Sequence, residues 1–241
     1  MTKKPKKRPA RKADRKTNWY VIGGIVGAGI IGLFVLMFAS MQSTATARES
    51  ESEANDRLLT YCDSNPGNCM VKGEADAPLT VIEISDYGCG HCRNFNVDKA
   101  DALDAEYVQS GQVRWIVMPF ALQNQSGQLP TGPTAVAAMC ADEQGRFFDF
   151  HHTIFERQGE PDYNTNSSFV SAATDLGMDL GAFNSCLDNN DYASVLRKNV
   201  SIIQSASVRS TPTFFIGGRK IEGNLPNLSD FQNVINAALG S

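Results

Sequence analysis

The N-terminal region contains two contrasting stretches, a basic tail and then a long apolar run. Residues 20–39 (YVIGGIVGAGIIGLFVLMFA) carry no charge, and about 20 apolar residues are what a helix needs to cross a bilayer core of about 30 Å. Residues 1–18 hold nine of the 22 Lys and Arg residues and one acid, Asp14. Because positive charge collects on the cytoplasmic side of membrane segments, we expect a cytoplasmic tail over residues 1–18, a transmembrane helix over 19–41 and an extracytoplasmic location for the rest.

A cleaved signal peptide is the alternative for this region, since residues 45–47 (Ala-Thr-Ala) have the small-x-small pattern of a cleavage site. The apolar run exceeds the roughly 7–15 residues usual in signal peptides, so a retained anchor is favoured. Either outcome delivers the following residues outside the cytoplasm. Residues 42–57 are small, polar and charged, which predicts a flexible linker and a folded domain over 58–241.

Beyond the linker, apolar positions alternate between strand-like and helix-like spacing. An apolar run at 79–85 predicts a buried strand, a helical pattern follows at 90–109, and 113–118 predict a second strand. Two short strands are expected around Gly217-Gly218, a hairpin signal, before a last helix that opens at Asn227. Between them lie helical patterns at 132–144, 146–157, 166–176, 181–188 and 191–207. This order predicts an α/β domain with several helices inserted before its last two strands.

The distribution of charge changes the functional picture. The chain has a formal net charge of −4, with 22 basic and 26 acidic groups; without the nine basic and one acidic groups of the tail, residues 19–241 carry 13 and 25, a net −12. Neutralising phosphates requires a basic surface, so the folded domain is a poor candidate for binding nucleic acid. The topological role of the basic tail is sufficient to explain it.

Four of the six cysteines are candidates for structural disulfides. Cys62 and Cys69 enclose a turn-forming loop, DSNPGN, whose ends must be close, and a bridge there would contribute about 2.5 kcal/mol on the loop-entropy model. Cys140 and Cys186 each lie on the apolar stripe of a predicted helix. A bridge between these helices would contribute about 4 kcal/mol, and two buried free thiols are the alternative.

Cys89 and Cys92 have the spacing C-x-x-C and lie directly after the first predicted strand, at the start of the helix that follows it. The free N–H groups and positive end of a helix stabilise a thiolate, which favours Cys89 as the nucleophile. Protonated His91 would lower the pKa of Cys89 further. Cys92, one turn into the helix, would be shielded and would resolve a mixed disulfide. The pattern predicts a redox-active pair in an oxidising compartment.

Other uses of C-x-x-C are less well supported. Arg93 stands where a c-type haem attachment site has histidine, which excludes that use. A zinc site would need a second ligand pair, and a purely structural bridge is disfavoured because this arrangement is strained and reducible. We therefore expect no cofactor and no metal, with a metal-binding module using Cys89, His91 and Cys92 as the alternative from another class.

Two segments resemble the DsbA-like family of thioredoxin-fold proteins. Residues 73–95 (GEADAPLTVIEISDYGCGHCRNF) resemble its opening strand and C-x-x-C helix, and residues 210–223 (STPTFFIGGRKIEG) resemble its closing cis-proline strand and hairpin. The resemblance covers about residues 70–240 and implies a thioredoxin fold with an inserted helical subdomain at about 130–208. The family often has cysteines where Cys140 and Cys186 stand, which supports their bridge. The inner dipeptide is Gly-His, as in protein disulfide isomerase, rather than the Pro-His of DsbA, so the redox poise stays open.

The resemblance also implies roles for residues outside the C-x-x-C motif. A cis bond between Thr211 and Pro212 would bring the Thr211 backbone beside Cys89, where it could pair with an extended substrate segment. Glu83 stands where the family and thioredoxin have a buried acid that exchanges protons with the resolving Cys92; an acid at the sheet edge is the alternative. Because a carboxylate in a buried strand is costly, we expect a raised pKa for Glu83 and a more stable domain without it.

These features predict a membrane-anchored, extracytoplasmic thiol–disulfide oxidoreductase that donates the Cys89–Cys92 disulfide to exported proteins or peptides. By resemblance, a quinone-linked membrane protein of the DsbB or vitamin K epoxide reductase type would reoxidise it. A disulfide isomerase or reductase is the nearest alternative, although the 16-residue linker leaves no room for the dimerisation domain of dedicated bacterial isomerases. His151 and His152 are expected to cover a helix surface rather than to bind metal.

Overall fold

The structure, a computed structural model, describes residues 30, 33, 36–37, 50–189 and 192–240. The basic tail and most of the transmembrane helix expected at 19–41 lie outside these residues. Across the part of the chain that is described, no helix combines the length and the apolar character that crossing a bilayer requires.

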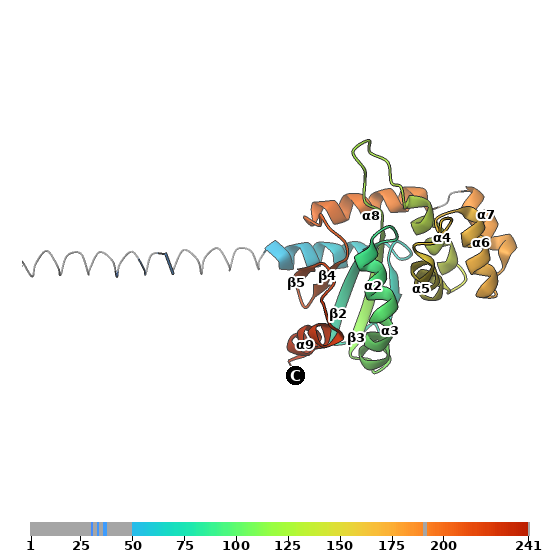
Figure 1. Ribbon diagram of the computed structural model, residues 1–241. Helices are drawn as coiled ribbons and strands as arrows, with labels where there is room; N and C mark the ends of the chain where they lie inside the picture. The colour runs from blue at the N-terminus through green and yellow to red at the C-terminus, as the bar shows by residue number, and fades with distance from the viewer. Residues whose placement is uncertain (1–29, 31–32, 34–35, 38–49, 190–191, 241) are drawn as a thin grey trace, which may run out of the picture. The chain divides into compact units, whose positions relative to one another are not determined.

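A five-stranded mixed sheet lies at the centre of the folded domain (Figure 1). β2 and β3 run parallel to each other, and the other neighbouring strands pair antiparallel. β2 and β3 are buried along nearly their whole length, as the continuous apolar runs at 79–85 and 113–118 predict for strands covered on both faces. In sheet order the strands are β1 (Met70–Lys72), β3 (Val113–Phe120), β2 (Leu79–Asp86), β4 (Thr213–Ile216) and β5 (Arg219–Glu222).

The helix that follows β2 packs on one face of this sheet together with the C-terminal helix α9 (Leu228–Leu239). An aromatic cluster joins them: the ring of Phe95 lies 4.6 Å from Phe214 and 5.0 Å from Phe231, and stacks on Trp115 at 6.0 Å between centroids. The single helix expected at 90–109 is divided at Lys99, where φ is −134°. Its three parts are α2 (Gly90–Asp98), α3 (Ala100–Leu103) and the π-helical turn η1 (Asp104–Val108).

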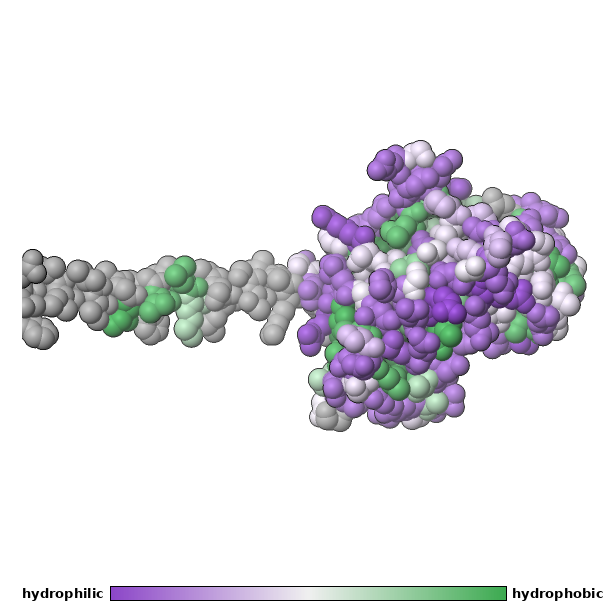
Figure 2. Space-filling view, in the orientation of Figure 1, coloured by the Kyte–Doolittle hydropathy of each residue, from purple (hydrophilic) through white to green (hydrophobic). Residues whose placement is uncertain are grey.

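Among the residues that the structure describes, five helices are inserted between β3 and β4, as the helical patterns at 132–207 predict. Within this insertion α5 packs against α2, so the insertion borders the helix that carries the C-x-x-C motif. Figure 2 shows that hydrophilic side chains cover most of the visible face of the folded domain, with hydrophobic ones in small patches. The inserted helices are α4 (Gly132–Asp142), α5 (Phe147–Arg157), α6 (Asn166–Asp175), α7 (Leu180–Asn189) and α8 (Ala193–Ser205).

Two disulfides lie away from the C-x-x-C motif. The Cys140–Cys186 bridge joins α4 to α7, with Cα atoms 5.8 Å apart, and therefore ties together two helices of the insertion. The Cys62–Cys69 bridge closes the loop that leads into β1, with Cα atoms 5.5 Å apart. All four cysteines are buried, so the disulfides belong to the hydrophobic core.

Residues 50–64 are helical, which corrects the expectation of a flexible linker for residues 50–57. Ala54 and Leu58 are buried in the core, and Tyr61 Oη donates to Asn199 Oδ1 of α8 at 2.8 Å. The spacing of Ala54, Leu58 and Cys62 places them on one helix face. Most residues around these three are charged or polar, so the composition of the segment did not indicate an apolar helix face. The folded domain therefore begins at or before residue 50.

Candidate active site

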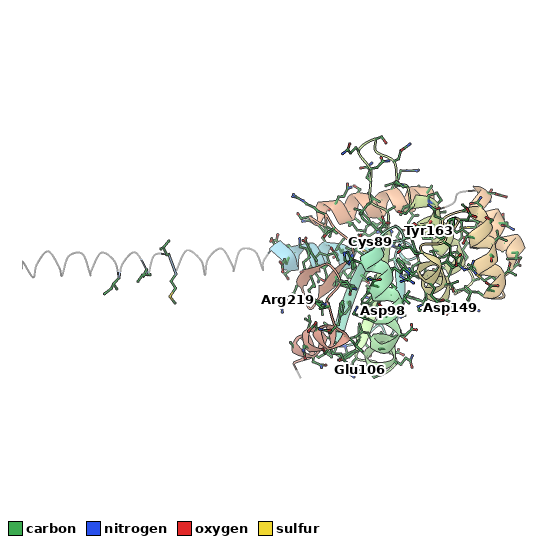
Figure 3. The ribbon with its side chains drawn as sticks, in the orientation of Figure 1. Cys89, Asp98, Glu106, Asp149, Tyr163 and Arg219 are labelled. Carbon is green, nitrogen blue, oxygen red and sulfur yellow. A yellow bond between two sulfur atoms is a disulfide. The ribbon has the colours of Figure 1, made fainter. Side chains whose placement is uncertain are left out.

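The C-x-x-C motif lies at the junction of β2 and α2, where a tight turn leads from strand to helix. Cys89 is the N-cap residue of α2, and its backbone N–H donates to Asp86 O at 3.0 Å. Gly88 allows close packing in this turn, because a Cβ there would lie 2.9 Å from Thr131 Cγ2. Cys89 is partly exposed whereas Cys92 is fully buried. Only Cys89, at the N-terminal end of α2 in Figure 3, is accessible to a substrate.

The surroundings of Cys89 stabilise its thiolate and lower its pKa from 9.0 to about 5. The hydrogen bond from the Cys92 thiol contributes most, burial opposes it, and hydrogen bonds from Thr211 and from the backbone N–H groups of Cys92 and His91 add to it. His91 therefore acts through its backbone, and its side chain is exposed, which differs from the role expected for its imidazole. Cys89 is a thiolate at neutral pH.

Cys92 has the opposite character. Burial raises its pKa well above that of an ordinary thiol, and the hydrogen bond to Cys89 and the negative charge there raise it further. The backbone N–H of Asp86 donates to Cys92 Sγ at 3.5 Å. In the reduced protein the proton therefore stays on the buried sulfur and the charge stays on the accessible one.

These opposite shifts predict how alkylation depends on pH. In the reduced full chain, we expect Cys89 to react with iodoacetamide at a rate that rises with pH and reaches half its plateau near pH 5, because only the thiolate reacts. Cys92→Ala removes the strongest stabilising hydrogen bond and should move the midpoint to higher pH. A wild-type midpoint near that of a free thiol would contradict the assignment. Stopped-flow alkylation followed by mass spectrometry measures both proteins.

Asp86 braces the turn in front of the motif, and the sequence contained no clear sign of this. Its Oδ1 accepts hydrogen bonds from Gly88 N–H at 2.7 Å and from Thr131 Oγ1 at 2.9 Å. Its Oδ2 accepts one from Leu122 N–H. One buried carboxylate thus joins the active-site turn to both ends of the 122–131 loop between β3 and α4. An acid directly after a buried strand is the signal that could have drawn attention to it.

Glu83 is buried, as the resemblance implied, and both oxygens of its carboxylate accept hydrogen bonds. Its carboxylate accepts hydrogen bonds from Ser85 Oγ, from Asn96 Nδ2 at 2.9 Å and from Trp115 Nε1 at 3.0 Å. Burial raises its pKa, but the nearby His151, whose Nε2 lies 3.9 Å from Glu83 Oε1, and the hydrogen bonds from Ser85 and Asn96 outweigh burial, so the pKa is lowered. The expected raised pKa is therefore wrong. The reason is that the partners come from β3, α2 and α5, which the local sequence does not reveal.

The two histidines of α5 differ in their surroundings. His151 is buried, 4% exposed, so the expectation that it covers a helix surface is wrong. Its Nδ1 lies 2.7 Å from Tyr87 Oη and its Nε2 lies 3.0 Å from Asn96 Oδ1. His152 is partly exposed and lies 3.5 Å from Glu156. The aromatic run around His151, which fills the core beside it, was the available sign of burial.

The Thr211–Pro212 peptide bond is cis, and this segment borders the reactive sulfur. Cys89 Sγ and the carbonyl oxygen of Thr211 are 3.2 Å apart, although 122 residues separate them in the chain. Thr211 is 8% exposed. The structure therefore brings Cys89, Cys92 and Thr211 together at one site, with Glu83 behind α2.

An accessible thiolate and a buried thiol at the start of a helix, after a central strand and beside a cis-proline segment, define a protein thiol–disulfide oxidoreductase. The thiolate is the nucleophile that such exchange requires, and the buried thiol is its resolving partner. The inserted helices make the class DsbA-like.

Comparison with known proteins agrees with this class. A family model described as thioredoxin matches residues 65–237, and the chain belongs to the thioredoxin family. It is 25% identical over 171 residues to Disulfide bond formation protein D of Bacillus subtilis, across 68% of this chain and 72% of that protein. The fold is similar to that of a variant of alpha-DsbA1 from Wolbachia pipientis, with a TM-score of 0.62 and 21% identity over 73% of this chain and 92% of that one.

A second kind of relative is much longer than this chain. Na(+)/H(+) antiporter NhaA 3 of Salinispora tropica is 26% identical over 204 residues, which are 84% of this chain but 30% of the antiporter. The chain therefore spans less than a third of that protein's length.

Proposed function

We propose that the protein is an oxidase that donates its Cys89–Cys92 disulfide to exported polypeptides. The observation that carries this proposal is the difference in exposure and pKa between the two cysteines. Cys89 is accessible with a pKa of about 5, and Cys92 is buried with a raised pKa. A stable Cys89 thiolate favours the reduced form, and a dithiol whose reduced form is stabilised has an oxidising disulfide. The Thr211 carbonyl beside Cys89 Sγ offers an acceptor to the backbone of an extended substrate.

The exchange proceeds in two balanced steps. A substrate thiolate attacks Cys89 Sγ, the Cys89–Cys92 bond breaks, and Cys92 takes the electron pair together with a proton that comes from solvent. A second substrate thiolate then attacks the substrate sulfur of the mixed disulfide, and Cys89 leaves as a thiolate. Two electrons pass from the substrate to the protein. Because a thiol of low pKa leaves readily, the Cys89 thiolate promotes the second step.

Each turnover leaves the protein reduced, so an electron acceptor is required. We propose that a quinone-linked membrane protein of the DsbB or vitamin K epoxide reductase type reoxidises it. The name of the Bacillus relative, which refers to disulfide bond formation, and two further disulfides in this chain support an oxidising compartment outside the cytoplasm.

The redox state of the pair in intact cells tests the proposed direction. After acid quenching and thiol alkylation, we expect Cys89 and Cys92 to be mostly oxidised, because the partner of an oxidase keeps its active-site pair in the disulfide form. Deleting the reoxidising partner should shift the pair to the reduced form. A mostly reduced pair in unperturbed cells would instead assign the protein to the reductases or isomerases.

We also propose that the N-terminal apolar segment anchors the domain to the membrane. The charge-free run at 20–39 and the basic residues before it support a single span with a cytoplasmic N-terminus. A retained anchor would hold the active site close to a membrane-embedded reoxidase.

Limited proteolysis of spheroplasts tests this topology. Protease added outside should release a soluble fragment that begins before residue 50, because residues 50–57 are helical and partly buried and resist cleavage. Alkaline extraction should leave the uncut protein with the membranes. Protection of the full chain while outward-facing control proteins are cut would contradict the orientation, and loss of the N-terminal segment without added protease would indicate a signal peptide.

A further inference from the structure

A buried polar network behind α2 has no role in the exchange steps described above. The network consists of Tyr87, His151, Asn96 and Glu83. His151 contacts Tyr87 Oη and Asn96 Oδ1 at 2.7 and 3.0 Å. Asn96 Nδ2 donates to Glu83 Oε1 at 2.9 Å and to the carbonyl oxygen of Cys92 at 3.1 Å. All four side chains are buried, and His151 alone comes from the helical insertion.

The hydrogen-bonding capacity of each member fixes the direction of the network. Burial, followed by the charges of Glu83 and Asp86, raises the pKa of Tyr87 well above its ordinary value, so its hydroxyl keeps its proton and can donate it. Asn96 Nδ2 donates to Glu83 and Cys92, so Asn96 Oδ1 is the atom that accepts from His151. His151 Nδ1 then accepts, and Nε2 carries the proton that it donates to Asn96 Oδ1. This contact turns the amide NH2 of Asn96 toward Glu83 and Cys92. His151 therefore determines how Asn96 is oriented.

A pocket of about 360 Å³ reaches this network from α5 and α3. Glu83, Asn96 and His151 form part of its wall. Neither Cys89 nor Thr211 is among the residues described as lining it, so the pocket is distinct from the surface to which a substrate attaches. A bound substrate would cover that surface, whereas the pocket would stay open to water.

The pocket wall also carries the charged groups that face His151 from the neighbouring elements. Lys72 of β1 and Asp104 of η1 pair at 2.6 Å and largely neutralise each other. Asp101 of α3 is exposed and lies 3.9 Å from His152, which shows that the pocket opens to solvent. Asp149 of α5 pairs with Arg146 at 2.7 Å; it is labelled in Figure 3. Glu83 is thus the buried carboxylate in the wall.

We propose that His151 is a positioning residue for thiol–disulfide exchange, which holds Asn96 and Glu83 in place behind Cys92 and joins them to the pocket through which protons are exchanged with water. This inference rests on the proposed function. When Cys92 resolves a mixed disulfide, its thiol gives a proton to the Glu83 carboxylate. The sulfur electron pair forms the bond to Cys89 Sγ, and the bond from Cys89 to the reoxidising partner breaks, so the partner leaves as a thiolate and the Cys89–Cys92 disulfide is restored.

Ionisation of Glu83 links His151 to this step. The mixed disulfide removes the negative charge of Cys89, one of the causes that raise the pKa of Cys92, and so makes the Cys92 proton easier to transfer. Glu83 accepts that proton only when it is ionised. Without His151, burial would raise the pKa of Glu83, because His151, whose Nε2 lies 3.9 Å from Glu83 Oε1, is the largest of the causes that lower it. The carboxylate would then hold its own proton and could not act as a base.

The test compares His151→Gln with His152→Gln, its neighbour on the same helix and the same pocket wall. The reduced full chain is mixed with an aromatic disulfide reagent whose released thiolate is coloured. The first release reports attack by Cys89, and the second reports resolution by Cys92. In His151→Gln the acid side of the pH profile of resolution should move to higher pH. One pH unit below the new midpoint, resolution in His151→Gln should be about tenfold slower than at the plateau of its pH profile, because about a tenth of Glu83 is then ionised.

His152→Gln should stay within about twofold of wild type, since its ring lies beside Asp101 and Glu156, at 3.9 and 3.5 Å, and these acids are outside the network. An unshifted pH profile in folded His151→Gln, with Glu83→Gln slow, would overturn the inference while the proposed function stands. Absence of the first release would instead count against the proposed function. If His151→Gln does not fold, Ala100→Leu narrows the pocket and leaves every hydrogen bond of the network in place; resolution at least about threefold slower is expected, and an unchanged rate overturns the proton route.

Discussion

Cys92→Ser is expected to accumulate mixed disulfides with substrate proteins through Cys89, whereas Cys89→Ser should accumulate almost none. Cys89 is the accessible thiolate, and Cys92 is fully buried. Without the resolving thiol, the bond between Cys89 and a substrate persists, because a serine hydroxyl does not attack a disulfide. Non-reducing gels of acid-quenched cells, followed by mass spectrometry of the high-molecular-weight bands, would measure the trapped fraction.

The double variant Cys89→Ser/Cys92→Ser is the matched control for that experiment and should give no such bands. The other four cysteines are paired in disulfides, so they should not capture substrates. Equal trapping by both single variants would refute the assignment of Cys89 as the nucleophile.

Glu83→Leu is expected to destabilise the domain by about 3 kcal/mol or more, since removing one partner of a buried ionic network leaves the others unsatisfied. Trp115 Nε1, Asn96 Nδ2 and Ser85 Oγ all donate to this carboxylate. This direction is opposite to the expectation from the sequence, which treated the acid as an isolated buried charge. Urea denaturation of the reduced full chain measures the change.

The pH dependence of that change provides a second check. The pKa of Glu83 is lower in the folded state than in an unfolded chain, so its contribution to stability is present above the unfolded pKa and is lost as the pH falls through the folded one. The difference between wild type and Glu83→Leu should therefore narrow in acid. Glu74→Leu, at an exposed carboxylate, should change stability by no more than about 0.5 kcal/mol. If the Glu83→Leu domain is more stable than wild type at neutral pH, the hydrogen bonds to Glu83 do not offset the free-energy cost of burying its carboxylate.

Local sequence patterns predicted the elements that position the active site. The apolar runs at 79–85 and 113–118 and the C-x-x-C spacing depend on neighbouring residues, and they marked β2, β3 and the N-terminal end of α2. Thr211 was found through resemblance, because no local pattern connects it with Cys89. The predictions failed in two situations. Around Leu58, polar residues outnumber the apolar face of the helix, and at His151 burial depends on elements that are distant in the sequence.

The polar partners behind α2 show why the rest of the site could not be predicted. His151 and Asp86 have their contacts across 55 and 45 residues, to Asn96 and Thr131. A charged or ionisable residue in a periodic pattern indicates a surface position unless its partner is known. The partner is supplied by tertiary packing, and no spacing in the chain encodes it.

The contact between Cys89 and Thr211 also has a consequence for the biogenesis of the protein. A chain that is synthesised from its N-terminus contains Cys89 and Cys92 well before Thr211, which follows Cys89 by 122 residues. Until β4 reaches the sheet, the environment that supports the Cys89 thiolate is incomplete, and closing so long a loop has an entropic cost. The pKa of Cys89 therefore reaches its final value only after nearly the whole domain has folded around it.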